Sequence, residues 1–218
     1  AGSGTRMKSK LPKVLHSCCG IPLLNHVVRL AIKRKTSPIV IVVSPSNEKR
    51  IRELLLATFP DAPLKFAVQA IQRGTGDAVR VGLEAISGFA GQVVILSGDV
   101  PLISGSTLSR LNKAASRVSM GFLTSNFPDM TGYGRVVRVK GAVTRIVEER
   151  DCSSAEKKIA EGNAGVYQCD ASLLRAALGQ LKSENAQGEF YLTDVVEMAA
   201  GEKGASAVCV GDWKEVMG

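Results

Sequence analysis

The chain has 218 residues, which is enough for one or two domains with a sizeable buried core, and its 28 Lys and Arg against 20 Asp and Glu give a formal net charge of +8. With 45% hydrophobic and 22% charged residues, the composition is typical of a folded globular protein and excludes disordered and fibrous classes. The longest apolar run, residues 39–43, is far shorter than the roughly 18 residues of a membrane span, and no secretory leader is visible, so we expect a cytoplasmic protein.

Helices and strands alternate through the first half of the chain. Apolar residues at helical spacing predict the helices, and short β-branched runs predict the strands. The expected elements are a helix at 23–34, a strand at 38–43, a helix at 47–59, a strand at 64–69, a helix at 75–86, a strand at 93–96 and a helix at 107–115. This alternation is typical of a largely parallel, doubly wound sheet.

After residue 117 the pattern changes, because two short strands flank Lys140-Gly141 and predict an antiparallel hairpin. The expected elements are strands at 119–126, 135–139 and 142–149, a short helix after a capping box at 153–156, a strand at 165–169, helices at 171–181 and 193–200, and a strand at 205–210. We therefore predict one α/β domain over residues 1–218, Rossmann-like, with a mostly parallel mixed sheet and an inserted antiparallel hairpin region.

The five cysteines have no metal-binding spacing, and the only histidines are His16 and His26. We interpret the cysteines as idle thiols in a reducing compartment. The sequence thus argues against a zinc site and against histidine as an acid–base catalyst.

Residues 1–14 hold half of the net charge of +8, because they contain no acid and four basic residues, namely Arg6, Lys8, Lys10 and Lys13. Gly2 and Gly4 would let backbone N–H groups approach an anion, so this segment is a candidate polyphosphate site; a frayed basic arm is the simpler alternative. General nucleotide motifs do not fit, because the chain has no Gly-Lys pair for a Walker loop and the dinucleotide fingerprint fails at Met7.

Two strand-to-loop junctions carry polar groups suited to a nucleotide. Residues 68–78 contain a strand end, a glycine loop and a helix start, and Gln69 could pair with a base edge through both its donor and its acceptor. Residues 93–102 deliver Asp99 at the carboxyl end of an apolar strand, where a carboxylate could share Mg²⁺ with substrate phosphates. An ordinary turn and a helix-capping aspartate are the respective structural alternatives.

The sequence G-S-G-T-R-M at Gly2–Met7, followed by Pro12-Lys13, resembles the signature of sugar-1-phosphate nucleotidyltransferases. Further segments resemble the N-acetylglucosamine-1-phosphate uridyltransferases in the family order, namely Q-A-I-Q-R-G-T-G-D-A from Gln69, S-G-D-V-P-L from Ser97, T-G-Y-G-R from Thr131 and N-A-Q-G-E-F-Y-L-T-D from Asn185. The resemblance runs over the whole chain and implies a nucleotidyltransferase fold with Mg²⁺ as cofactor.

The resemblance also implies roles for individual residues. At the nucleotide it implies that Arg6 and Lys13 stabilise the triphosphate and the transferring phosphoryl group and that Asp99 binds Mg²⁺; further nucleotide contacts would come from Ala1, Gly2, Gln69, Gly74, Thr75, Ser97 and Gly98. At the amino sugar it implies a backbone contact from Gly134, a hydroxyl contact from Glu148, and polar contacts from Asn163, Tyr191 and Thr193.

The sequence departs from the family pattern at its two ends. Family members have Leu-Ala and a strand ahead of the position of Ala1, and an Asn after the position of Gly218 that helps to bind the metal. Bifunctional members continue into a β-helix acetyltransferase domain, of which this sequence contains nothing. Many relatives also have Tyr at the position of Ser97.

The implied reaction joins UTP and N-acetyl-α-D-glucosamine 1-phosphate to give UDP-N-acetylglucosamine, a peptidoglycan precursor, and pyrophosphate. The alternatives are transfer to another sugar 1-phosphate or from another nucleotide, and a catalytically idle nucleotide-sugar sensor. A basic nucleic-acid-binding module is a third hypothesis, but only 10 residues (6 Phe, 3 Tyr and 1 Trp) are aromatic and half of the excess charge lies in one glycine loop. We therefore expect no nucleic-acid partner.

Overall fold

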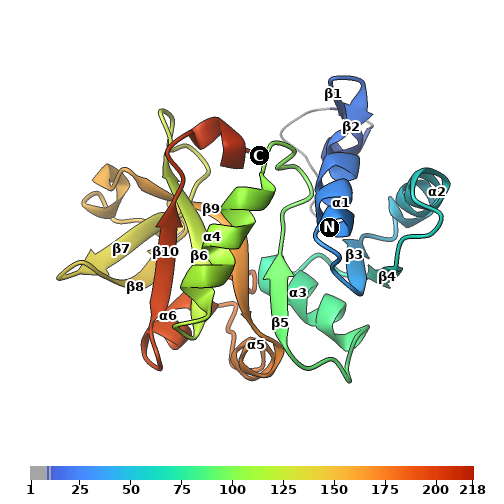
Figure 1. Ribbon diagram of the computed structural model, residues 1–218. Helices are drawn as coiled ribbons and strands as arrows, with labels where there is room; N and C mark the ends of the chain where they lie inside the picture. The colour runs from blue at the N-terminus through green and yellow to red at the C-terminus, as the bar shows by residue number, and fades with distance from the viewer. Residues whose placement is uncertain (1–8, 10) are drawn as a thin grey trace.

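The computed structural model describes Ser9 and residues 11–218, and Figure 1 shows their arrangement. The described chain begins with a short 3-10 turn at Lys13–Leu15 and a small hairpin of β1 (Ser17–Cys18) and β2 (Ile21–Pro22), none of which the sequence patterns predict. The next elements match the predicted helices and strands within a few residues: α1 (Leu23–Lys33), β3 (Ile39–Val43), α2 (Glu48–Thr58), β4 (Leu64–Val68), α3 (Thr75–Glu84), β5 (Gln92–Ile95) and α4 (Gly105–Ala115).

The second half of the chain supplies most of the larger sheet. Its elements are β6 (Met120–Asn126), β7 (Arg135–Val139), β8 (Ala142–Val147), β9 (Glu161–Asp170), α5 (Ala171–Leu178), α6 (Asp194–Ala200) and β10 (Ala205–Cys209), followed by a 3-10 turn at Trp213–Val216. The predicted hairpin is confirmed as β7 and β8. The capping box is present too, since Ser153 and Glu156 exchange hydrogen bonds, although the turn that follows is a 3-10 turn at Glu156–Lys158.

The α/β class and the mixed sheet are confirmed, but parallel pairing is less frequent than predicted. Within the described residues, β3 pairs with β4 and β6 with β10 in parallel, whereas β1–β2, β5–β9, β6–β9, β7–β8 and β7–β9 are antiparallel. The larger sheet has the order β10-β6-β9-β7-β8, and β5 pairs with β9 off this path. Antiparallel pairing dominates because β9 runs against each of its three partner strands.

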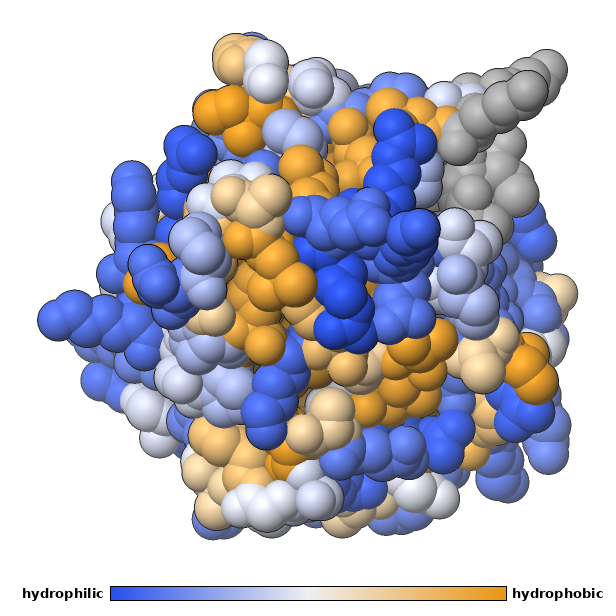
Figure 2. All heavy atoms as spheres, turned by 90° about the vertical axis from the view of Figure 1, so that its right-hand side faces the viewer, coloured by the Kyte–Doolittle hydropathy of each residue, from blue (hydrophilic) through white to orange (hydrophobic). Residues whose placement is uncertain are grey.

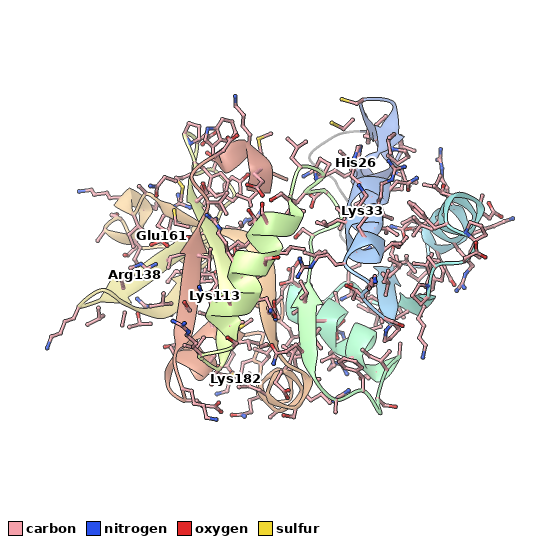
Figure 3. All side chains as sticks on the ribbon, in the orientation of Figure 1. His26, Lys33, Lys113, Arg138, Glu161 and Lys182 are labelled. Carbon is pink, nitrogen blue, oxygen red and sulfur yellow. The ribbon has the colours of Figure 1, made fainter. Side chains whose placement is uncertain are left out.

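Strand β9 is the central element of this sheet. One of its edges pairs with β6, and the other is shared by two strands: β7 pairs at Gly162, and β5 pairs from Tyr167 to Asp170. The strand begins at Glu161, earlier than the predicted residue 165. Figure 3 shows Arg138 of β7 beside Glu161, and their side chains form an ion pair with Nε and Oε2 2.7 Å apart.

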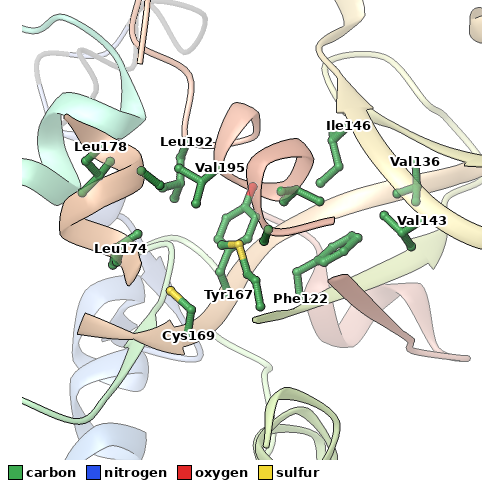
Figure 4. Close-up of a cluster of buried hydrophobic side chains, with 14 of the residues drawn as sticks. Phe122, Val136, Val143, Ile146, Tyr167, Cys169, Leu174, Leu178, Leu192 and Val195 are labelled. Atoms are coloured by element: carbon green, nitrogen blue, oxygen red, sulfur yellow. The ribbon is translucent and has the colours of Figure 1, made fainter. Parts of the chain in front are cut away.

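The sheet is covered by helices on both faces. Successive residues of β6 point to opposite faces, so Phe122 packs in one apolar cluster and Leu123 in another. The first cluster holds residues of α5 and α6, and Figure 4 shows its side chains around Phe122 and Tyr167. The second cluster holds Leu108 and Leu111 of α4. Apolar residues of β6 thus pack against helices on both faces of the sheet.

A third apolar cluster joins α1, α2 and β3, with Leu55 of α2 fully buried. On the outer face that carries α2, apolar and hydrophilic residues are interspersed (Figure 2). Among the described residues, no helix is both long and apolar enough to cross a membrane.

Candidate functional site

A cavity of about 330 Å³ opens where β5 and β7 leave the shared edge of β9. Its wall includes six residues that the sequence analysis singled out, namely Lys13, Ser97, Asp99, Gly134, Glu148 and Asn163. Some of their chain neighbours line it as well. These residues come from five separate segments of the chain. The sheet topology therefore brings residues predicted to contact phosphate and residues predicted to contact the sugar into one cavity.

The middle of the shared β9 edge forms one side of the cavity. The backbone N–H of Asn163 donates to Gly134 O at 2.9 Å, and Ser97 Oγ donates to Gly165 O at 3.2 Å. Ala164 lies between these two contacts and also lines the cavity. Because β5 and β7 pair with β9 on either side of residues 163–165, these three residues line the cavity.

Lys13 and Asp99 form an ion pair at one end of the cavity, with Nζ and Oδ2 2.7 Å apart. Lys13 belongs to the 3-10 turn after Pro12, and Asp99 follows the carboxyl end of β5. Their side chains are 38% and 25% exposed, so both can still meet a ligand. A cation and a carboxylate at a strand end suit a phosphate group and its counterion.

The donor set around Asp99 fits Mg²⁺ rather than a transition metal. Within the described part of the chain, no group of three or more His, Cys, Asp or Glu side chains could hold a metal ion. Mg²⁺ does not need such a group, since it binds through one or two carboxylates and completes its shell with water and substrate phosphates. Asp99, a cavity-lining carboxylate beside Lys13, satisfies that requirement.

Glu148 follows β8 and lies on the cavity wall. Burial raises the pKa of its carboxyl group, and the charges of Asp194, Asp151 and Glu189 act in the same direction. Thr193 opposes this shift, because its Oγ1 donates a hydrogen bond to Glu148 Oε1 at 3.0 Å. The Thr193 hydroxyl thus fixes the orientation of Glu148, whose second oxygen can accept from a ligand hydroxyl.

Asn163 is held by two internal hydrogen bonds. Its Nδ2 donates to the hydroxyl of Tyr167 at 2.6 Å, and its Oδ1 accepts from the backbone N–H of Gly165 at 3.1 Å. Tyr167 is itself buried in the apolar cluster of Figure 4, and burial strongly raises its pKa, so its hydroxyl stays protonated. The Asn163 amide is therefore held in one orientation at the cavity wall.

The glycine loop after β4 forms a second group of predicted residues, Gln69, Gly74 and Thr75, away from the wall of this cavity. The loop packs against the segment that carries Tyr191. The backbone N–H of Gly76 donates to Phe190 O at 2.8 Å, and that of Leu192 donates to Thr75 Oγ1 at 3.1 Å. Gly74 has φ +102° and an added Cβ would lie 2.7 Å from Phe190 O, so only glycine fits there.

Tyr191 and Thr193 are buried and lie behind the cavity wall. The Tyr191 hydroxyl accepts from Gln187 Nε2 at 2.8 Å and donates to Asp151 Oδ2 at 3.1 Å. Thr193 reaches the cavity through Glu148. Gly98 lies between Ser97 and Asp99. A Cβ added at Gly98 would lie 3.2 Å from Leu24 Cδ1, so the backbone packs closely there. Ala1, Gly2 and Arg6 lie outside the described residues.

Three residues near the site carry no prediction of their own from the sequence. Tyr133 lines the cavity and stacks on Phe127 with ring centroids 3.8 Å apart; its place inside T-G-Y-G-R is a signal for it. Tyr167 holds Asn163 by a hydrogen bond. The two residues are four positions apart on one strand, and no motif in the sequence indicates that they interact. Asp77 accepts a hydrogen bond from Gln69 at 2.8 Å, and its position in the first turn of α3 resembles an ordinary helix-start acid.

An α/β fold with a lysine, a carboxylate and polar strand-edge residues around one cavity defines a nucleotidyltransferase-type site. Comparison with known proteins agrees: residues 1–146 match the MobA-like NTP transferase domain, and the chain belongs to this family. In fold, the chain is similar to a nucleoside-diphosphate-sugar pyrophosphorylase from Vibrio cholerae, with a TM-score of 0.71, 13% identity, and coverage of 96% of this chain and 88% of that one.

Curated relatives are more similar in sequence. The chain is 44% identical over 224 residues to the bifunctional protein GlmU of Streptomyces griseus, covering 100% of this chain and 46% of the relative. It is 50% identical over 200 residues to the bifunctional protein GlmU of Burkholderia multivorans, covering 91% and 43%. The chain therefore spans somewhat less than half the length of these relatives.

Proposed function

We propose that this chain transfers a uridylyl group from UTP to N-acetyl-α-D-glucosamine 1-phosphate, giving UDP-N-acetylglucosamine and pyrophosphate. One observation carries the proposal. A single cavity is lined by the Lys13–Asp99 ion pair at one end and by Glu148 and Asn163, whose side chains suit sugar hydroxyls. The similarity to bifunctional GlmU proteins supports this substrate pair. The proposed location is cytoplasmic.

The chemistry is an in-line attack of a sugar phosphate oxygen on the α-phosphorus of UTP, with pyrophosphate leaving. Such a step needs positioning and charge neutralisation more than a strong base. Lys13 supplies a positive charge next to the phosphates, and Arg6 is proposed to supply a second. Asp99 would hold Mg²⁺, which neutralises phosphate charge when bound. No histidine or cysteine is required.

The sugar would lie along the middle of the β9 edge. Glu148 accepts from a sugar hydroxyl, because Thr193 occupies only one of its carboxylate oxygens. Asn163 contributes a fixed amide, and Gly134 permits close approach because it has no side chain. Tyr191 and Thr193 are proposed to shape the N-acetyl end from behind Glu148. Gln69, Gly74 and Thr75 would contact uracil, Ser97 and Gly98 the ribose, and Ala1 and Gly2 further parts of the nucleotide.

A pyrophosphate-release assay tests this proposal. The protein is incubated with Mg²⁺, a panel of sugar 1-phosphates, and UTP, CTP, ATP, GTP or dTTP. We expect the highest kcat/KM with UTP and N-acetylglucosamine 1-phosphate. A higher value with another sugar phosphate or nucleotide would identify a different member of the same reaction class, and binding of UDP-N-acetylglucosamine without turnover of any pair would favour the sensor hypothesis.

A further inference from the structure

The side-chain amide of Gln69 is held in one orientation by two acceptors. Its Nε2 donates to Asp77 Oδ2 at 2.8 Å and to the backbone carbonyl of Gly74 at 3.2 Å. An amide nitrogen has two protons, so both are occupied. No hydrogen bond to Gln69 Oε1 comes from the part of the chain that the structure describes. The side chain is only 2% exposed, and the oxygen is the part of the amide that the described residues leave for a ligand.

Asp77 makes the shorter of the two contacts that set this orientation, and an ionised carboxylate can only accept hydrogen bonds. The residue is 4% exposed in the first turn of α3, and its other oxygen pairs with the guanidinium of Arg80. Burial opposes ionisation, but the hydrogen bonds from Gln69 and Arg80 and the charges of Arg80 and Arg73 outweigh it and lower the pKa of Asp77. Turning the Gln69 amide over would place its oxygen against this carboxylate.

We propose that Asp77 sets the nucleobase specificity of the enzyme by holding Gln69 as a hydrogen-bond acceptor. A base with a ring N–H, such as uracil at N3, can donate to Gln69 Oε1. Cytosine has an unprotonated N3, so it would place one acceptor against another. This inference rests on the proposed function, which brings the base to Gln69. Asp77 does not contact the base in this proposal and is a positioning residue.

The substitution Asp77→Asn tests this role with almost no change in shape. Asparagine can turn its nitrogen toward Gln69, so only the Gly74 carbonyl, at 3.2 Å, still favours the original orientation of the Gln69 amide, and the turned amide becomes accessible. We expect the ratio of kcat/KM for UTP to that for CTP to fall by about tenfold or more, which corresponds to the loss of roughly one discriminating hydrogen bond. Asp77→Ser, whose hydroxyl can also donate or accept, should lower the ratio in the same direction.

Arg80→Lys is the matched control. It changes the other partner of Asp77 but keeps a positive charge beside the carboxylate, which stays an acceptor against Gln69. Its UTP-to-CTP ratio should equal that of the wild type, even if its melting temperature changes. Circular dichroism of each variant checks the fold. The specificity ratio is informative because a merely structural role of Asp77 would lower the rates with both nucleotides together.

Two results would overturn the inference. One of them would also overturn the proposed uridylyl specificity, and the other would not. If the wild type does not prefer UTP over CTP, the uridylyl specificity of the proposed function fails along with the role of Asp77. If the wild type prefers UTP and both Asp77 variants keep its ratio, only the role of Asp77 fails.

Discussion

Replacing Gly134 by alanine should test the geometry of the cavity wall most directly. A Cβ at this position would lie 2.8 Å from Ile146 Cγ2 and 3.6 Å from Glu148 Oε2. The first distance is too short for two methyl carbons. Ile146 is buried against Val136 and Val143, so it cannot move aside without disturbing the core.

The expected cost follows from this overpacking. Inserting a methyl group into a packed core typically costs about 1–3 kcal/mol, and for a domain of this size that lowers the melting temperature by roughly 2–12 °C. The same methyl group narrows the space beside Glu148. We therefore expect Gly134→Ala to raise the KM for the sugar phosphate more than the KM for UTP.

Denaturant unfolding and steady-state kinetics measure the two effects separately. Gly88→Ala is the matched control, because an added Cβ there meets nothing within 4 Å and stability should barely change. Equal unfolding free energies for Gly134→Ala and the wild type, with an unchanged KM for the sugar phosphate, would refute the packing argument. An equal loss in both glycine variants would show that the effect is not specific to the cavity wall.

Three further predictions concern the polar groups of the site. Lys13→Ala and Asp99→Ala should each lower kcat in the pyrophosphate-release assay by about 10²–10³-fold with little change in melting temperature, and near-wild-type turnover would remove the residue from its role. Burial raises the pKa of Glu148, so the folded state holds its proton more tightly than the unfolded chain; wild-type stability should fall as pH rises from the ordinary glutamate range through the raised pKa. Glu148→Gln cannot ionise, so its melting temperature should lack that decline, and parallel curves for the two proteins as the pH rises above the ordinary glutamate range would contradict the argument. Gln69→Ala should weaken UTP binding in calorimetry by about tenfold, and an unchanged affinity would exclude Gln69 from the base site.

Local sequence signals were sufficient for most helices and strands and for Asp99 of the cavity. Asp99 could be predicted because a short apolar strand precedes it, and ligands of α/β sheets gather at the carboxyl ends of such strands. Glu148 and Asn163 were predicted from family motifs alone, whereas Lys13 was also indicated by the basic segment 1–14. Their presence in one cavity agrees with those motifs, while their individual roles stay predictions.

Pairings between distant segments were not predictable from local signals. The sequence gives no sign that β9 begins at Glu161 or that β5 and β7 share one of its edges, because register depends on partners far along the chain. The contact of Thr193 with Glu148 has the same origin. Asp77 was missed for another reason: an acid in the first turn of a helix is common, and only the structure shows that it faces Gln69.

The shared edge of β9 has a consequence for folding and for ligand-linked stability. The cavity wall exists only when β9 has paired with β5, β6 and β7, and β6 in turn pairs with β10 near the end of the chain. Contacts between such distant segments form late and cooperatively. A ligand in the cavity therefore binds only the fully folded sheet, so it should stabilise β5 and β10 against hydrogen exchange as much as the residues that it touches.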